Sequence, residues 1–72
     1  MTVELGHEMT LVEVAALPAV VDLMTAARAL GIRRTTAYAL ARGGSFPCPV
    51  FRAGASYRVP TSGLLRLLGL AT

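Results

Sequence analysis

The chain has 72 residues, of which 54% are hydrophobic, and a formal net charge of +3 at pH 7. This length allows no more than one domain, and Glu13, Pro18 and Asp22 interrupt the apolar stretches before any reaches the roughly 20 residues of a membrane span. No basic start of a secretory signal is present, and the single cysteine, Cys48, cannot form an internal disulfide, so we expect a cytoplasmic protein.

The first 21 residues are expected to form an N-terminal arm, and residues 22–72 the core domain, because the composition changes from acidic to basic near Pro18. Within the arm, Thr10–Glu13 fits a capping box, and apolar residues follow at helical spacing until Pro18. A strand is the alternative, since Val and Leu are frequent. We expect the arm to serve association between copies rather than the fold of the core; a frayed tail is the alternative.

Two short helices are predicted next. Thr25 is expected to cap a helix over Ala26–Leu30, which Gly31 ends in the left-handed conformation. A second helix is expected over Arg34–Arg42, ended by Gly43-Gly44. Two short helices joined by a turn that contains glycine are typical of a helix-turn-helix.

A β-hairpin is predicted from the strands Val50–Ala53 and Tyr57–Val59. A three-residue loop places the apolar residues of both strands on one face and pairs Arg52 with Arg58 on the other. A two-residue loop would put an aromatic residue opposite Arg58 and mix the faces, so we expect the longer loop. One feature disagrees, because glycine usually lies late in such loops and Gly54 comes first.

A last helix is expected after the hairpin, capped by Thr61 or Ser62 and ended by Gly69. The elements together predict an α+β fold: a small winged helix-turn-helix with two short helices, a β-hairpin wing and a C-terminal helix.

The helix predicted over Arg34–Arg42 has two different sides. Small and apolar residues form one stripe, whereas Arg34, Tyr38 and Arg42 are spaced by four and are expected to line one exposed row. Arginine suits guanine or phosphate, and the tyrosine and threonine hydroxyls suit phosphate. An ordinary solvated face is the alternative, but such a face usually includes glutamate. The candidate DNA-contacting residues are Arg33, Arg34, Thr35, Thr36, Tyr38, Arg42, Arg52 and Arg58.

Charge is divided along the chain. All four acidic residues lie within the first 22 residues, and all seven arginines follow them, so no acidic residue occurs from Leu23 onward. Seven uncompensated positive charges repel one another, and a bound polyanion relieves this repulsion and releases counterions. A basic surface that contacts only solvent is the alternative; arginine in place of lysine favours forked contacts to phosphate and guanine.

The residue inventory gives no support for an enzyme, a metal site or a cofactor. His7 is the only histidine and Cys48 the only cysteine, so they cannot form a tetrahedral metal site. No acidic residue from Leu23 onward is available as a general base. Gly43-Gly44 follows a helix instead of preceding one as a phosphate loop does.

Four short runs stand out within residues 21 to 69: Ala26-Ala27, Leu30-Gly31-Ile32, Thr36-Ala37-Tyr38 and Tyr57-Arg58-Val59-Pro60. Through these runs the chain resembles the excisionase-type winged helix-turn-helix domains, which are related to the MerR group. It implies site-specific DNA binding, either as a recombination directionality factor beside an integrase or as a small transcription regulator. The chain departs from the family at Arg33, where Ser or Thr usually caps the recognition helix, and at Ala55, where the wing is usually basic.

We therefore expect sequence-specific binding of double-stranded DNA by an excisionase-like recombination directionality factor of a mobile element, with an integrase and further copies on DNA as protein partners. A small MerR-like transcription regulator is the first alternative. A protein-interaction adaptor that does not bind DNA is the alternative of a different class. No membrane partner is expected.

Overall fold

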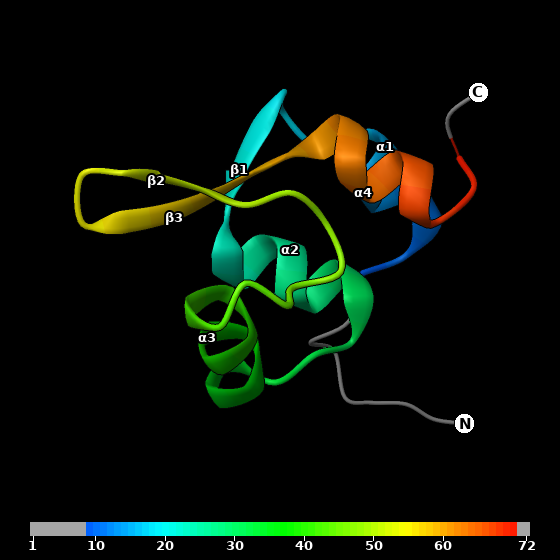
Figure 1. Cartoon of the computed structure of the whole chain (residues 1–72). Helices are drawn as coiled ribbons and strands as arrows, with labels where there is room; N and C mark the ends of the chain where they lie inside the picture. Colours follow the sequence, from blue (N-terminus) through cyan, green and yellow to red (C-terminus); the bar gives the residue numbers. More distant parts are fainter. Residues whose placement is uncertain (1–8, 71–72) are drawn as a thin grey trace.

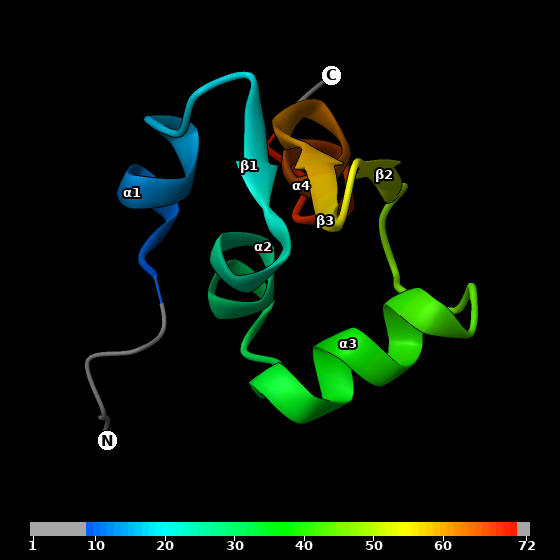
Figure 2. The ribbon, with the colours of Figure 1, turned by 90° about the vertical axis from the view of Figure 1, so that its left-hand side faces the viewer.

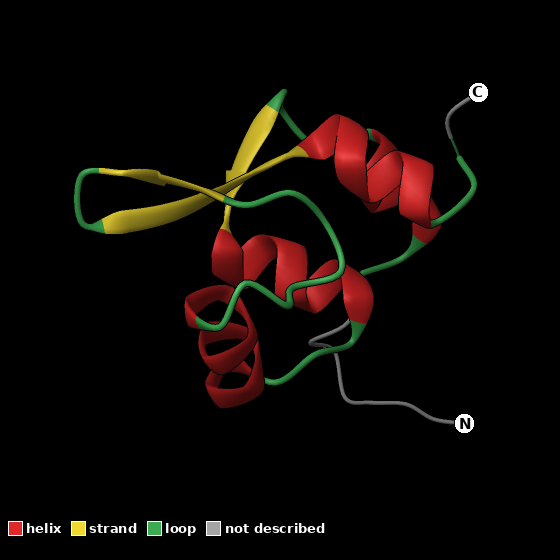
Figure 3. Cartoon of the chain, viewed as in Figure 1, coloured by secondary structure: helices red, strands yellow, loops and turns green. Residues whose placement is uncertain are grey.

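The computed structural model describes residues 9–70, which form an α+β domain with a winged helix-turn-helix layout (Figures 1 and 3). The elements in this part of the chain are, in order, α1 (Leu11–Ala15), β1 (Val20–Asp22), α2 (Leu23–Leu30), α3 (Arg34–Arg42), β2 (Phe51–Ala53), β3 (Ser56–Pro60) and α4 (Thr61–Leu67). The predicted fold class is thus confirmed. None of these helices is long and apolar enough to cross a membrane.

The helix-turn-helix consists of α2 and α3. The helix α2 begins at Leu23, earlier than predicted, because the Asp22 carboxylate accepts a hydrogen bond from the Thr25 backbone N–H at 2.9 Å and acts as the N-cap. The prediction that Thr25 caps this helix was therefore wrong. Gly31 ends α2 with a φ of 71°, as predicted, and α3 has the predicted bounds.

The sheet has the strand order β1-β3-β2, with β3 in the centre. The strand β1 was not predicted; it pairs antiparallel with β3 and places Val21 opposite Val59. Beyond the sheet, the Thr61 backbone N–H donates to the Ala19 carbonyl at 2.8 Å, and the Thr61 hydroxyl donates to the Pro18 carbonyl. Neither Thr61 nor Ser62 caps α4, since its N-cap is Pro60.

The hairpin β2–β3 has a two-residue loop, Gly54-Ala55, in place of the three-residue loop predicted from side-chain parity. Its register pairs Phe51 with Arg58, Arg52 with Tyr57, and Ala53 with Ser56. Gly54 has a φ of 65°, and glycine at the first position of a two-residue loop is a favoured hairpin arrangement. The parity argument failed because Phe51 does not enter the core and leaves 46% of its surface exposed.

The expected boundary between arm and core domain falls inside β1, which begins at Val20. The capping box of α1 is present: Glu13 N–H donates to the Thr10 hydroxyl at 3.2 Å, and Thr10 N–H donates to the Glu13 carboxylate at 2.8 Å. Val14 is only 1% exposed, and Leu17 packs against the core. The described part of the arm thus belongs to the folded domain; residues 1–8, with Glu4, His7 and Glu8, lie outside the described residues.

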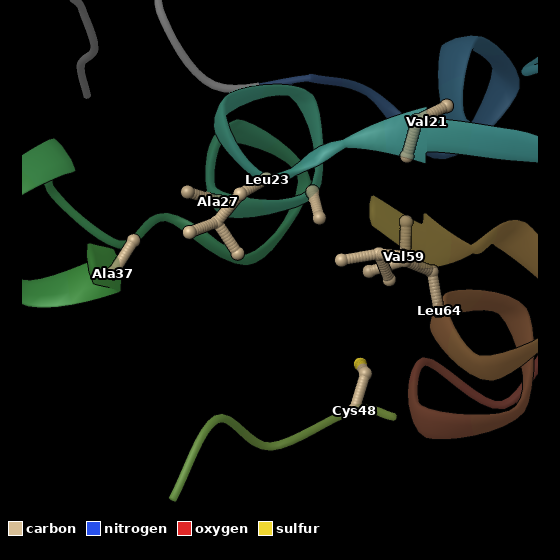
Figure 4. Close-up of a cluster of buried hydrophobic side chains, with 8 residues drawn as sticks. Val21, Leu23, Ala27, Ala37, Cys48, Val59 and Leu64 are labelled. Atoms are coloured by element: carbon tan, nitrogen blue, oxygen red, sulfur yellow. The ribbon is translucent and has the colours of Figure 1, made fainter. Parts of the chain in front are cut away.

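The core lies between the helix-turn-helix, the sheet and α4 (Figure 4). Its buried members are Val21, Leu23, Ala26, Ala27, Ala37, Cys48, Val59 and Leu64. Ala27 of α2 and Ala37 of α3 are fully buried. Their small side chains allow the two helices to approach closely, which fixes how α3 is presented to solvent.

Candidate nucleic-acid interface

The helix α3 turns one side to the core and the other to solvent, as predicted for a recognition helix. Ala37 is fully buried and Leu40 and Ala41 are half-buried. The exposed residues on and beside this helix are Arg33, Arg34, Thr35, Thr36, Ala39 and Arg42. Figure 1 shows the hairpin projecting to the left above α3, and Figure 2 shows α3 along the lower edge of the domain with the hairpin seen end-on.

The N-terminus of α3 has no side-chain cap. Arg33 occupies the N-cap position in an extended conformation, its side chain makes no capping hydrogen bond, and the first turn contains no acidic residue. The first N–H groups of a helix have no partners within the helix. Together with the flanking Arg33 and Arg34 side chains, they suit an incoming anion such as phosphate.

Tyr38 does not stand in an exposed row with Arg34 and Arg42. It is half-buried against the core, and its ring packs edge-on against Tyr57, with 6.1 Å between ring centroids and an interplanar angle of 63°. The Arg34 guanidinium carbon lies 5.9 Å from the Tyr38 ring centroid. This placement makes Tyr38 a link between α3 and the hairpin rather than a freely accessible contact.

A similar contact occurs on the hairpin, where the Arg52 guanidinium carbon lies 5.0 Å from the centroid of the Tyr57 ring. The order Arg34, Tyr38, Tyr57, Arg52 therefore connects the exposed start of α3 to β2 through two cation–π contacts and one aromatic pair. Sequence reasoning missed this series, because it depends on the orientation of the hairpin against α3. The signal in the sequence was limited to the presence of Tyr38 on α3 and Tyr57 on β3.

Arg52 and Arg58 do not face each other, contrary to the prediction. Arg58 pairs with Phe51 on one side and with Asp22 of β1 on the other, so it lies on the face of the sheet opposite to Arg52. Hydrogen bonds from Thr25 lower the pKa of the Asp22 carboxyl below its ordinary value of 3.8, and the nearby charge of Arg58 lowers it further. Asp22 thus offsets part of the charge of Arg58, whereas Arg52 lies on the same side as α3.

The described residues contain no grouping of three or more histidine, cysteine or acidic side chains that could hold a metal ion. Cys48 is a buried free thiol within the core, and burial raises its pKa. It is therefore a neutral packing residue at physiological pH.

The exposed arginines at this interface differ in their position on the fold. Arg33 and Arg34 flank the start of α3, Arg42 lies at its end, and Arg52 lies on the neighbouring strand. Comparison of the chain with protein-family models, with curated proteins and with solved structures finds no match.

Proposed function

We propose that this protein binds double-stranded DNA sequence-specifically, with α3 in the major groove and the β2–β3 hairpin along the adjacent backbone or minor groove. The observation that carries the proposal is the exposed side of α3, where arginine and threonine side chains stand without an acidic residue. The hairpin projects to the left of the domain in Figure 1, above α3. An α-helix fits the major groove, and its N-terminal residues usually reach base edges.

Within this arrangement the exposed residues divide by role. Arg34 and Thr35 lie in the first turn of α3 and are the candidates for base contacts. Arg33 and Arg42 lie at the two ends of the helix, where phosphates of the groove walls are nearest, and Arg52 adds a contact from the hairpin. Arg58 contributes less, because Asp22 lies across the strand from it.

Among DNA-binding roles we favour an excisionase-like recombination directionality factor acting beside an integrase in the cytoplasm, because of the resemblance described above. A small MerR-like transcription regulator uses the same contacts. A footprint on the DNA that flanks the native gene distinguishes the two: protected sites beside an integrase attachment site support the first, and protected sites over a promoter support the second.

The test of DNA binding is a salt titration of affinity. If roughly four phosphates are neutralised, log K falls with log salt at a slope near −3.6, from about −0.9 per phosphate. A slope near zero would refute the proposal. Arg34→Ala should weaken binding to a selected site by about 1–3 kcal/mol, and much less on random DNA. The matched control is Arg66→Ala, which removes the same charge from an exposed position of α4.

One observation favours a protein-interaction adaptor as a second candidate. On α1, Leu11 is 57% and Val12 is 80% exposed, and exposed apolar residues on one short helix are suited to a protein contact. This candidate predicts that the chain is not retained on DNA at any salt concentration, and that retention by a protein partner depends on Leu11 and Val12 but not on Arg34.

A further inference from the structure

A cavity of about 630 Å³ lies between the end of α3, the segment that leads to β2, and the hairpin. Ala41 and Arg42 contribute from α3, Phe46 and Val50 from the connecting segment, and Arg52 and Tyr57 from the hairpin. Its volume is within the range of about 300–1,000 Å³ that is typical of small-molecule sites. It is therefore large enough for a ligand of several rings or groups.

The charged side chains that line the cavity are all positive. Two arginines, Arg42 and Arg52, come from different elements, and no acidic residue of the described chain lines the cavity. The Arg52 guanidinium is held over the Tyr57 ring at 5.0 Å, which orders its planar group. Two guanidinium groups, of which that of Arg52 is held by Tyr57, suit an anion that has several oxygens, such as a phosphate, where no acidic side chain lines the cavity.

The remaining wall is apolar and aromatic. Phe46 and Tyr57 offer rings, and Val50 and two prolines offer aliphatic carbon. An inorganic anion would leave this wall uncovered, whereas a phosphate that carries a sugar and a base would cover it. Aromatic side chains accept a base or sugar ring by stacking.

We propose that this cavity binds one nucleotide unit, with its phosphate between Arg42 and Arg52 and its sugar or base against Phe46 and Tyr57. The unit comes either from a DNA strand or from a free nucleotide. The DNA source rests on the proposed function: if α3 and the hairpin contact neighbouring grooves, the DNA strand that separates these grooves passes between the two elements, both of which line the cavity. The free nucleotide does not require DNA binding.

The experiment is a titration of ¹⁵N-labelled protein, followed by amide chemical shifts, with thymidine 5′-monophosphate, thymidine, inorganic phosphate and a DNA duplex as separate probes. The expected result is that the nucleotide shifts the amides of Phe46 and Val50 and binds more tightly than thymidine or phosphate alone. Arg42→Gln and Arg52→Gln should each weaken nucleotide binding by about tenfold or more, as loss of a charge-assisted hydrogen bond does. Arg66→Gln, which removes an exposed charge outside the cavity, should leave it unchanged.

The duplex identifies the source of the nucleotide. Displacement of thymidine monophosphate by duplex assigns the cavity to a DNA strand, and simultaneous binding of both assigns it to a free nucleotide. Nucleotide binding without duplex binding refutes the proposed function and leaves the cavity assignment standing. Duplex binding that shifts the amides of α3 but not those of Phe46 and Val50, with no shift from the nucleotide, overturns the cavity assignment and leaves the proposed function standing.

Discussion

Replacement of Val14 by alanine tests whether the N-terminal helix is part of the fold. Val14 is 1% exposed, whereas Val12 on the same helix is 80% exposed, so the same substitution at Val12 is a matched control. The change removes two buried carbons, worth about 0.8 kcal/mol each, and leaves a small cavity that raises the loss to about 2 kcal/mol. The higher helix propensity of alanine, at most about 0.7 kcal/mol, applies equally to both variants.

The assay is thermal unfolding followed by circular dichroism. In a domain of this size, a loss of 1 kcal/mol lowers Tm by about 4–8 °C, so the Tm of Val14→Ala should lie about 8–16 °C below that of Val12→Ala. Val12→Ala should unfold at or slightly above the wild-type temperature. Equal midpoints for the two variants would show that α1 does not pack on the domain, and would restore the expectation of an arm that is separate from the core.

Three further predictions follow from single contacts. Gly63→Ala should lower the free energy of unfolding by about 1–2 kcal/mol despite the better helix propensity of alanine, because the new Cβ would lie 3.0 Å from the Pro49 Cδ. In denaturant unfolding, the additional change Pro49→Ala should restore most of this loss. A single variant more stable than the wild type would contradict this packing. Asp22→Ala should cost about 1 kcal/mol at pH 7 through loss of the N-cap. The pKa of Asp22 is lowered in the folded state, so this contribution is present above pH 3.8 and is lost as the pH falls through the folded pKa; a difference between variant and wild type that is independent of pH would refute it. A double-mutant cycle between Tyr38→Ala and Tyr57→Ala should give a coupling free energy of about 0.5–1.5 kcal/mol in unfolding. The control Tyr38→Phe, which keeps the ring, should be as stable as the wild type. Zero coupling would exclude the aromatic link between α3 and the hairpin.

The sequence predicted several helix caps and ends correctly where the stabilising interaction is between residues close together in the chain. The capping box of Thr10 and Glu13, the left-handed Gly31 and both ends of α3 were predicted from residues within one turn of each other. A hydrogen bond between a side chain and a backbone group three residues away depends on little beyond those residues. The division of α3 into a buried and an exposed side is local in the same sense, since it follows from the helical period.

The hairpin register could not be predicted from the alternation of side chains along the strands. That argument assumes that the apolar residues of both strands face the same core. In this sheet Val59 of the central strand β3 faces the core, where it pairs with Val21 of β1. The strand β1 is far from the hairpin in sequence and spans the expected boundary between arm and core domain. Phe51 is therefore free to stay on the other face, and the glycine preference of the loop decides the register.

The sequence by itself determined the fold class, the helix-turn-helix, the exposed arginine-bearing side of α3 and the separation of acidic from basic residues, because helical period, caps and charge are properties of neighbouring residues. Only the tertiary structure decided that β1 and α1 belong to the domain, that Arg52 lies on the side of α3 while Arg58 faces Asp22, and that Tyr38 packs against Tyr57. These features depend on which distant segments pair. Long-range pairing is set by the total burial and hydrogen bonding of the folded chain, which no single window of sequence contains.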